Sequence, residues 1–68
     1  MKLSARNVLP GVVQEIVKGA VTSHIRLKVG DAVVTASITN DAVAELGLKE
    51  GDRAYAVIKA TDVMIGRD

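Results

Sequence analysis

The chain has 68 residues, and its nine basic and eight acidic residues leave a net charge of +1. It contains no cysteine and one histidine, which excludes disulfide bonds and argues against a structural zinc site. The sequence has no run of basic residues that could follow the phosphate backbone of a nucleic acid. We find no signal peptide and no long apolar segment. We therefore expect one cytoplasmic domain over residues 1–68.

The first half of the sequence predicts two long strands. The first is expected from Leu3 to Val17, and Pro10-Gly11 interrupts it at an edge, a bulge or a strand crossing, because proline has no N–H to donate. Lys18-Gly19-Ala20 is expected to turn the chain. Val21 to Val29 then alternates with a period of two, which is typical of a half-buried strand. One face of this strand is expected to hold Val21, Ser23, Ile25, Leu27 and Val29.

The middle of the sequence predicts a third strand and one short helix. Gly30-Asp31 fits a short hairpin turn, and the valine- and threonine-rich segment Ala32–Thr39 fits the returning strand. Asn40–Gly47 is expected to be helical, with a polar N-cap at its start and the glycine as its left-handed stop. Because a helix of two turns must be held by packing, Val43 and Leu46 are expected to face the barrel.

The last part of the sequence predicts two more strands. Lys49–Asp52 is expected to be a turn, followed by strands over Arg53–Lys59 and Asp62–Ile65 with a break at Ala60-Thr61. The resulting order is three strands, one helix and two strands. This order favours an all-β fold, a five-stranded OB-fold-like Greek-key barrel with one short helix between the third and fourth strands.

The small size of the chain predicts self-association. A domain of this length buries only about 60% of the surface that its unfolded chain exposes. Apolar residues make up 49% of the sequence, and one small monomer cannot cover that much aliphatic surface. Because no disulfide can stabilise the fold, we expect a homo-oligomer in which part of this surface lies between subunits.

Hydrogen-bond donors gather near both ends of the chain. Ser4-Ala5-Arg6 offers a hydroxyl, backbone N–H groups and a planar guanidinium, and Lys59-Ala60-Thr61 offers an ammonium and a second hydroxyl. The alanines would allow the backbone to approach a ligand closely. Arg6 and Lys59 together could neutralise two negative charges, so the two segments indicate a site for a small oxyanion.

Two other function classes fit the sequence poorly. His24 lies on the polar face of its strand and no nucleophile motif is present, so we expect no enzyme activity. An OB-fold that binds single-stranded nucleic acid needs aromatic platforms for the bases and a basic surface. Tyr55 is the only aromatic residue and the net charge is close to zero, so we expect no nucleic acid partner and no membrane partner.

Four segments of the sequence resemble the molybdate-binding Mop domain, in particular the single-domain molbindins, over nearly the whole chain. They are Ser4-Ala5-Arg6-Asn7, Lys18-Gly19-Ala20-Val21-Thr22, the segment Glu45–Asp52, and Lys59-Ala60-Thr61-Asp62-Val63-Met64. The resemblance implies a barrel that binds molybdate or tungstate without a cofactor and without direct coordination of the metal by side chains. It also implies a hexamer, a trimer of dimers, with oxyanion sites between subunits.

The resemblance assigns the oxyanion-binding residues to the two ends of the chain: Ser4, Ala5, Arg6, Lys59, Ala60 and Thr61. A second oxyanion site is suggested at the turn formed by Lys18, Gly19, Ala20, Val21 and Thr22. We expect Arg6 and Lys59 of one site to come from different chains, since the N-terminal arm has little apolar anchorage. Asn7 is expected to tie the arm down.

The expected function is therefore binding of molybdate or tungstate for intracellular molybdenum storage and homeostasis. Two alternatives stay open on the sequence alone. One is a stand-alone molybdate-sensing or accessory subunit that acts through a partner. The other is an OB-fold nucleic-acid-binding module, in spite of its missing aromatic residues.

Overall fold

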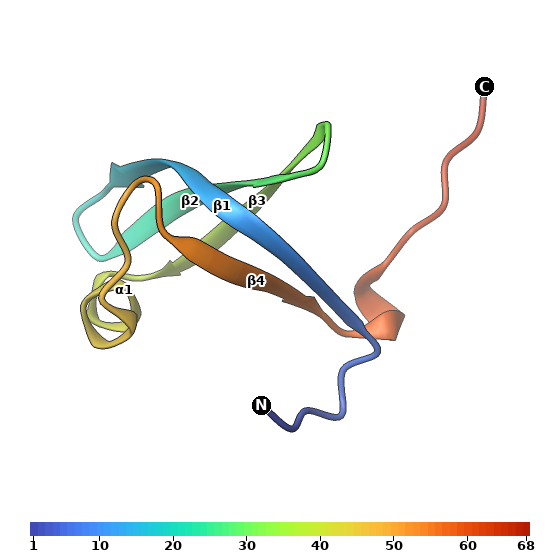
Figure 1. Ribbon diagram of the computed structural model, residues 1–68, viewed down its shortest axis with the longest axis horizontal. Helices are drawn as coiled ribbons and strands as arrows, with labels where there is room; N and C mark the ends of the chain where they lie inside the picture. Colours follow the sequence, from blue (N-terminus) through green and yellow to red (C-terminus); the bar gives the residue numbers. More distant parts are fainter.

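The computed structural model describes all of residues 1–68, and it shows one antiparallel sheet with one short helix (Figure 1). The four strands lie in the order β3-β2-β1-β4 and form an OB-like half-barrel. In chain order the elements are β1 (Asn7–Lys18), β2 (Thr22–Val29), β3 (Ala32–Thr39), α1 (Asn40–Leu46), β4 (Arg53–Ile58) and the 3₁₀ turn η1 (Ala60–Asp62). The helix lies between the third and fourth strands, as the sequence predicted, and no helix is long and apolar enough to cross a membrane.

Strand β1 is the longest strand, and it pairs with two different neighbours. Residues 7–12 pair with β4, and residues 12–18 pair with β2. Pro10 lies opposite Tyr55, in the part of β1 that has a neighbour on one side only. The missing N–H of proline therefore costs no ladder bond to β2, which confirms the edge expected there. The register with β2 shifts between Val13 and Glu15, which adds a bulge further along β1.

Gly11 marks the place where β1 passes closest to β2. A Cβ atom built on this residue would lie 2.5 Å from the carbonyl oxygen of Lys28 and 3.0 Å from side-chain atoms of Leu27 and Val29. Such a contact is too short for any real side chain, and its neighbours have little room to move, because Leu27 is a core residue and Val29 packs against the core. Gly11 is therefore required by packing and not by an unusual backbone angle.

The core is small and is formed by residues of β1 and β2. Val13, Ile25 and Leu27 are buried, and Ser23 is the one buried polar residue. This confirms the predicted inner face of β2, except that Val21 lies before the strand and is exposed. The partly buried residues packed against the core come from the four strands, from α1 and from the loop after it: Ile16, Val29, Ile38, Val43, Leu48, Ala54 and Ala56.

The short helix α1 is closed at both ends by its own residues. The hydroxyl of Thr39 accepts a hydrogen bond from the N–H of Ala42 and forms the N-cap. Gly47 adopts the predicted left-handed conformation, with φ 61°, and its N–H donates to the carbonyl of Ala44. The predicted packing of Val43 against the core is confirmed, whereas Leu46 is 68% exposed. Leu46 is the last helical residue, and it lies at the rim of an open groove.

Two predictions about strand ends are wrong. The first strand begins at Asn7 and not at Leu3, so the donor-rich arm lies outside the sheet. The predicted fifth strand over Asp62–Ile65 is absent, and the sheet has four strands. A strand needs the backbone of a neighbour, and residues 64–68 make no backbone hydrogen bond. Val63, Met64 and Ile65 are 46%, 91% and 92% exposed, so their apolar side chains find nothing to cover within their own chain.

The missing strand leaves the half-barrel open along an apolar groove of about 640 Å³. The groove lies between the two edge strands, β3 and β4, and thirteen of its fifteen lining residues are hydrophobic. Its floor includes the core residues Ile25 and Leu27. The groove therefore borders the core of this chain.

The close approach at Gly11 gives the first testable prediction. Gly11→Ala places a methyl group against β2 and should destabilise the protein by about 1–3 kcal/mol, as overpacked cores do. For a chain of this size each kcal/mol lowers the melting temperature by roughly 4–8 °C. Gly66→Ala is the control, since nothing lies within 4 Å of its added Cβ. Equal melting temperatures for the two variants at the same protein concentration would contradict the contact.

Candidate oxyanion-binding site

The pairing of β1 with β4 brings the two donor-rich ends of the chain to one corner of the sheet. Asn7, the first residue of β1, lies opposite Ile58, the last residue of β4. Because the two strands are antiparallel, Ser4-Ala5-Arg6 enters the sheet at the point where Lys59-Ala60-Thr61 leaves it (Figure 1). The end of the first donor segment and the start of the second therefore lie side by side, although they are more than fifty residues apart in the sequence.

A side chain fixes this corner in addition to the ladder. The Nδ2 atom of Asn7 donates a hydrogen bond of 3.2 Å to the carbonyl oxygen of Ile58. This bond joins the residue after the arm to the residue before the second donor segment. The expectation that Asn7 ties the arm down is confirmed.

The second donor segment is shaped by the turn η1. The N–H of Asp62 donates to the carbonyl of Lys59 at 2.9 Å, and the N–H of Val63 donates to the carbonyl of Ala60 at 3.3 Å. Lys59 keeps an extended backbone just before the turn. The turn was predicted only as a break between two strands, and the structure shows that it redirects the chain and presents Ala60 and Thr61 to solvent.

The corner is positively charged and its cations are unpaired. Arg6 and Lys59 are exposed, and neither side chain forms an ion pair or a hydrogen bond. The one ion pair in the structure joins Arg26 and Glu15 at 3.4 Å, further along the sheet. Asp62 is the carboxylate nearest in sequence, and it is paired with neither cation. Both cations therefore remain available to an anion.

The six predicted residues share one further property, their accessibility. Only Ala5 is partly covered, and the other five are exposed: Ser4, Arg6, Lys59, Ala60 and Thr61. Within one chain these residues are therefore open to water on at least one side. A dianion held here would keep much of its hydration unless a second surface covered it.

The second predicted segment lies at the other end of β1. Lys18, Gly19, Ala20, Val21 and Thr22 form the exposed turn into β2. The twelve-residue strand β1 separates this turn from the corner at the chain ends. The structure therefore does not join this turn to the corner formed by the chain ends.

Asn40 organises that turn, and sequence reasoning missed its role. Its Nδ2 donates to the carbonyl of Gly19 at 3.1 Å, its backbone N–H donates to the carbonyl of Val21 at 2.8 Å, and its Oδ1 accepts a hydrogen bond of 2.5 Å from the hydroxyl of Ser23. Ser23 is only 2% exposed. A serine at an inward position of an alternating strand was the available signal, because a buried hydroxyl requires a partner.

An OB-like half-barrel with donors gathered at one corner defines a small binding domain. The sequence matches the TOBE domain over residues 3–65, and the chain belongs to the TOBE domain family. It is 48% identical over 66 residues to molybdenum-pterin-binding protein 1 of Clostridium pasteurianum. That match covers 96% of this chain and 97% of the relative.

Solved structures are similar over nearly the same length. A molybdate-binding protein from Sporomusa ovata is 42% identical with a TM-score of 0.93, over 98% of this chain and 100% of that one. The cytoplasmic molybdate-binding protein ModG, solved with molybdate bound, is 49% identical with a TM-score of 0.84, over 88% of this chain and 43% of ModG. The resemblance indicated by the four sequence segments is confirmed, and these proteins are named for binding and not for catalysis.

The bond from Asn7 gives a prediction about the rigidity of this corner. Asn7→Ala removes a hydrogen bond worth about 1 kcal/mol and should loosen the end of the β1–β4 ladder. Hydrogen exchange should become faster at the amides of residues 7–9 and 57–59. Gln14→Ala is the control, because this exposed residue makes no side-chain hydrogen bond. Unchanged exchange at the corner in the Asn7 variant would show that the bond does not hold it.

Proposed function

We propose that this protein binds molybdate and serves as an intracellular store or buffer of molybdenum. The observation that carries the proposal is the pairing of Asn7 with Ile58, which places both donor-rich ends of the chain at one corner. The binding residues are then Ser4, Ala5, Arg6, Lys59, Ala60 and Thr61. The kinship with molybdate-binding proteins over the whole chain supports this choice of anion.

The chemistry of the anion matches the chemistry of the corner. Molybdate at neutral pH is a tetrahedral dianion whose four oxygens accept hydrogen bonds and donate none. Guanidinium, ammonium, hydroxyl and backbone N–H groups are all donors in this role. Phosphate carries a proton near pH 7, so its O–H group would face a donor of the site instead of an acceptor. Sulfate carries no such proton and differs from molybdate mainly in its smaller size. Tungstate has the same shape and charge as molybdate and fits the same donors.

The exposure of five of the six residues supports sites shared between subunits. A second chain would cover the open side of the corner and supply part of the donor set, so that Arg6 and Lys59 of one site come from different chains. The assembly we propose is a hexamer built as a trimer of dimers from single-domain chains, located in the cytoplasm. The turn at Lys18–Thr22, with its exposed cation and hydroxyl, is proposed as a second and separate oxyanion site.

Thermal unfolding tests the class of ligand. Molybdate and tungstate should raise the melting temperature, because a ligand at a hundred times its dissociation constant adds about 2.7 kcal/mol to the free energy of unfolding. Sulfate and phosphate at the same concentration and ionic strength should change it little. Equal stabilisation by sulfate would remove the claim of selectivity, and no shift with any oxyanion would contradict the proposed function.

A mixing experiment tests whether the site is shared. Arg6→Ala and Lys59→Ala should each abolish tight molybdate binding and leave the fold intact, because each leaves the dianion with half of its counter-charge. If the two residues of a site come from different chains, unfolding the variants together and refolding them should restore roughly one site in four. Each mixed pair then holds one intact site and one doubly altered site.

The measurement is a molybdate titration of the refolded mixture against each variant refolded alone. Mass spectrometry of the intact assemblies confirms that the two chains have mixed. If every site lies within one chain, each site still carries a substitution and mixing restores nothing. Zero recovery in confirmed mixed assemblies would therefore exclude the shared site.

A further inference from the structure

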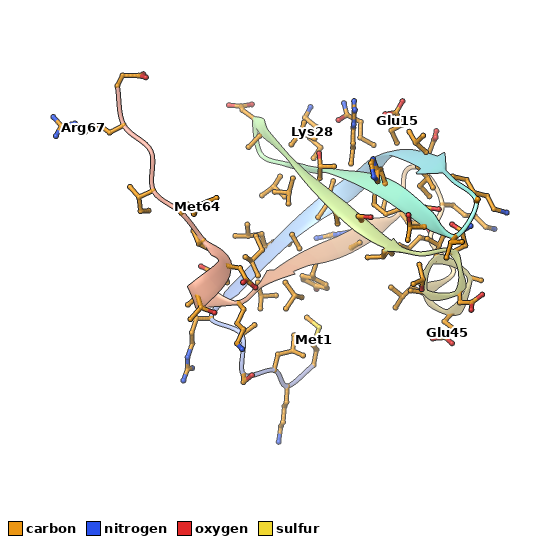
Figure 2. All side chains as sticks on the ribbon, turned by 180° about the vertical axis from the view of Figure 1, so that it is seen from behind. Met1, Glu15, Lys28, Glu45, Met64 and Arg67 are labelled. Carbon is orange, nitrogen blue, oxygen red and sulfur yellow. The ribbon has the colours of Figure 1, made fainter.

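The turn between β1 and β2 is held by a residue that lies about twenty positions further along the chain. Asn40, the first residue of α1, donates from Nδ2 to the carbonyl of Gly19 at 3.1 Å and from its backbone N–H to the carbonyl of Val21 at 2.8 Å. Figures 1 and 2 show the turn and α1 at the same end of the sheet, opposite the end from which the segment with Met64 leaves. The start of the helix therefore fixes the turn that we propose as the second oxyanion site.

The orientation of the Asn40 amide is fixed in its turn by Ser23. This serine is 2% exposed, and its hydroxyl donates to the Oδ1 atom of Asn40 at 2.5 Å. A buried hydroxyl requires an acceptor, and Oδ1 is the only acceptor of the amide group. The bond therefore holds the amide oxygen toward Ser23 and leaves the amide nitrogen to donate to Gly19.

The hydrogen bonds of the turn occupy its acceptors and leave donors free. The carbonyls of Gly19, Val21 and Thr22 all accept hydrogen bonds, the last of them from the N–H of Gly19 at 2.8 Å. The N–H groups of Ala20 and Val21 lie outside every strand and helix, and neither donates a hydrogen bond within the chain. Lys18 is exposed and forms no ion pair. The turn thus offers an anion two unpaired N–H groups and a cation.

The carbonyl of Gly19 is the group of this turn that depends on the Asn40 side chain. A Cβ atom at residue 19 would lie 2.7 Å from the carbonyl oxygen of Thr22, so the tight turn requires glycine here. Glycine has the widest choice of backbone angles, so the peptide after it is held by its hydrogen bonds and not by a side chain. Without the donor on Asn40, this carbonyl would be free to turn toward a bound anion, and oxygen would face oxygen.

We propose that Asn40, oriented by Ser23, is the positioning residue of an oxyanion site at the turn Lys18–Thr22, and that it acts by holding the carbonyl of Gly19 away from the anion. Asn40 acts through the turn and not through contact with the anion, because its Oδ1 and Nδ2 atoms both bond to protein groups. The inference rests on the proposed function, since it takes the turn as a second molybdate site. It adds a residue outside the turn on which that site depends.

Calorimetric titration with molybdate in two variant backgrounds separates the two sites. In a chain with Arg6→Ala, the corner lacks its guanidinium, so the remaining binding reports the turn. In a chain with Lys18→Ala, the turn lacks its cation, so the binding reports the corner. Asn40→Ala and Ser23→Ala are each added to both backgrounds. Ser37→Ala is the matched control, because Ser37 is an exposed serine of β3 that makes no side-chain hydrogen bond.

The variants should affect the turn and leave the corner unchanged. Asn40→Ala should weaken binding at the turn by about tenfold, and Ser23→Ala by about threefold, because each removes hydrogen bonds that hold the Gly19 carbonyl. Neither variant should change the affinity at the corner, and Ser37→Ala should change neither site.

Two results would overturn the proposal. The first is an unchanged affinity at the turn in Asn40→Ala, in a chain that keeps its sheet by circular dichroism. The second is an equal loss at the turn and at the corner, which is what a purely structural role would produce. If Asn40→Ala does not fold, the same comparison is decided by Ser23→Ala.

Hydrogen exchange without molybdate tests the structural premise separately. The amide of Gly19 donates within the turn, so it should exchange faster in Asn40→Ala than in Ser37→Ala. Equal exchange in the two variants would show that Asn40 does not hold the turn, and it would overturn the proposal.

Failure of this inference is distinct from failure of the proposed function. If the chain with Lys18→Ala binds molybdate and the chain with Arg6→Ala binds none, the function stands at the corner and only the inference fails. If the wild-type protein binds no molybdate, the proposed function fails and the inference fails with it.

Discussion

The antiparallel pairing of β1 with β4 is the contact on which the rest of this molecule depends. It spans Asn7 to Val12 on one strand and Arg53 to Ile58 on the other. Without it the last strand would have no place in the sheet, since β4 pairs with no other strand. The same pairing brings the two ends of the chain together. Fold and candidate site therefore share one cause, the register that sets Asn7 opposite Ile58.

The sheet that results has a small core. Four of the 68 residues are buried, and one of these is a serine whose hydroxyl must keep its bond to Asn40. One side of the core faces the open groove. The exposed valine, leucine and methionine side chains of this chain are the apolar surface that the proposed homo-oligomer would bury. The small size of the chain and its proposed self-association are thus two aspects of one constraint.

The sequence predicted those parts of the fold that local physics determines. Alternation in Val21–Val29 gave the inner face of β2, and Gly30-Asp31 and Gly47 stand at the turn and the helix end where their conformations are required. The prediction of a fifth strand was wrong because the apolar pattern of Asp62–Ile65 does not reveal whether a pairing strand exists within the chain. Leu46 was placed inward on helical periodicity, yet the helix ends there, beside the groove.

The sequence predicted which chemical groups the candidate site contains, but it did not predict how they are arranged in space. Hydroxyls and cations near both ends can be read from the sequence, but their meeting at one corner depends on the order β3-β2-β1-β4. The pairing of Asn7 with Ile58 is a tertiary contact. So is the hydrogen bond from the Asn40 side chain to a turn about twenty residues earlier in the sequence. Long-range pairing of this kind cannot be read from single-residue propensities.

The account as a whole is tested most directly by locating the anion. Crystals grown with molybdate can be measured at the molybdenum absorption edge, where anomalous scattering marks the metal and nothing else in this chain. The account predicts a peak within hydrogen-bonding reach of an Arg6 guanidinium and a Lys59 ammonium, beside the end of the β1–β4 ladder. A fully occupied peak elsewhere, with neither cation in contact, would contradict it.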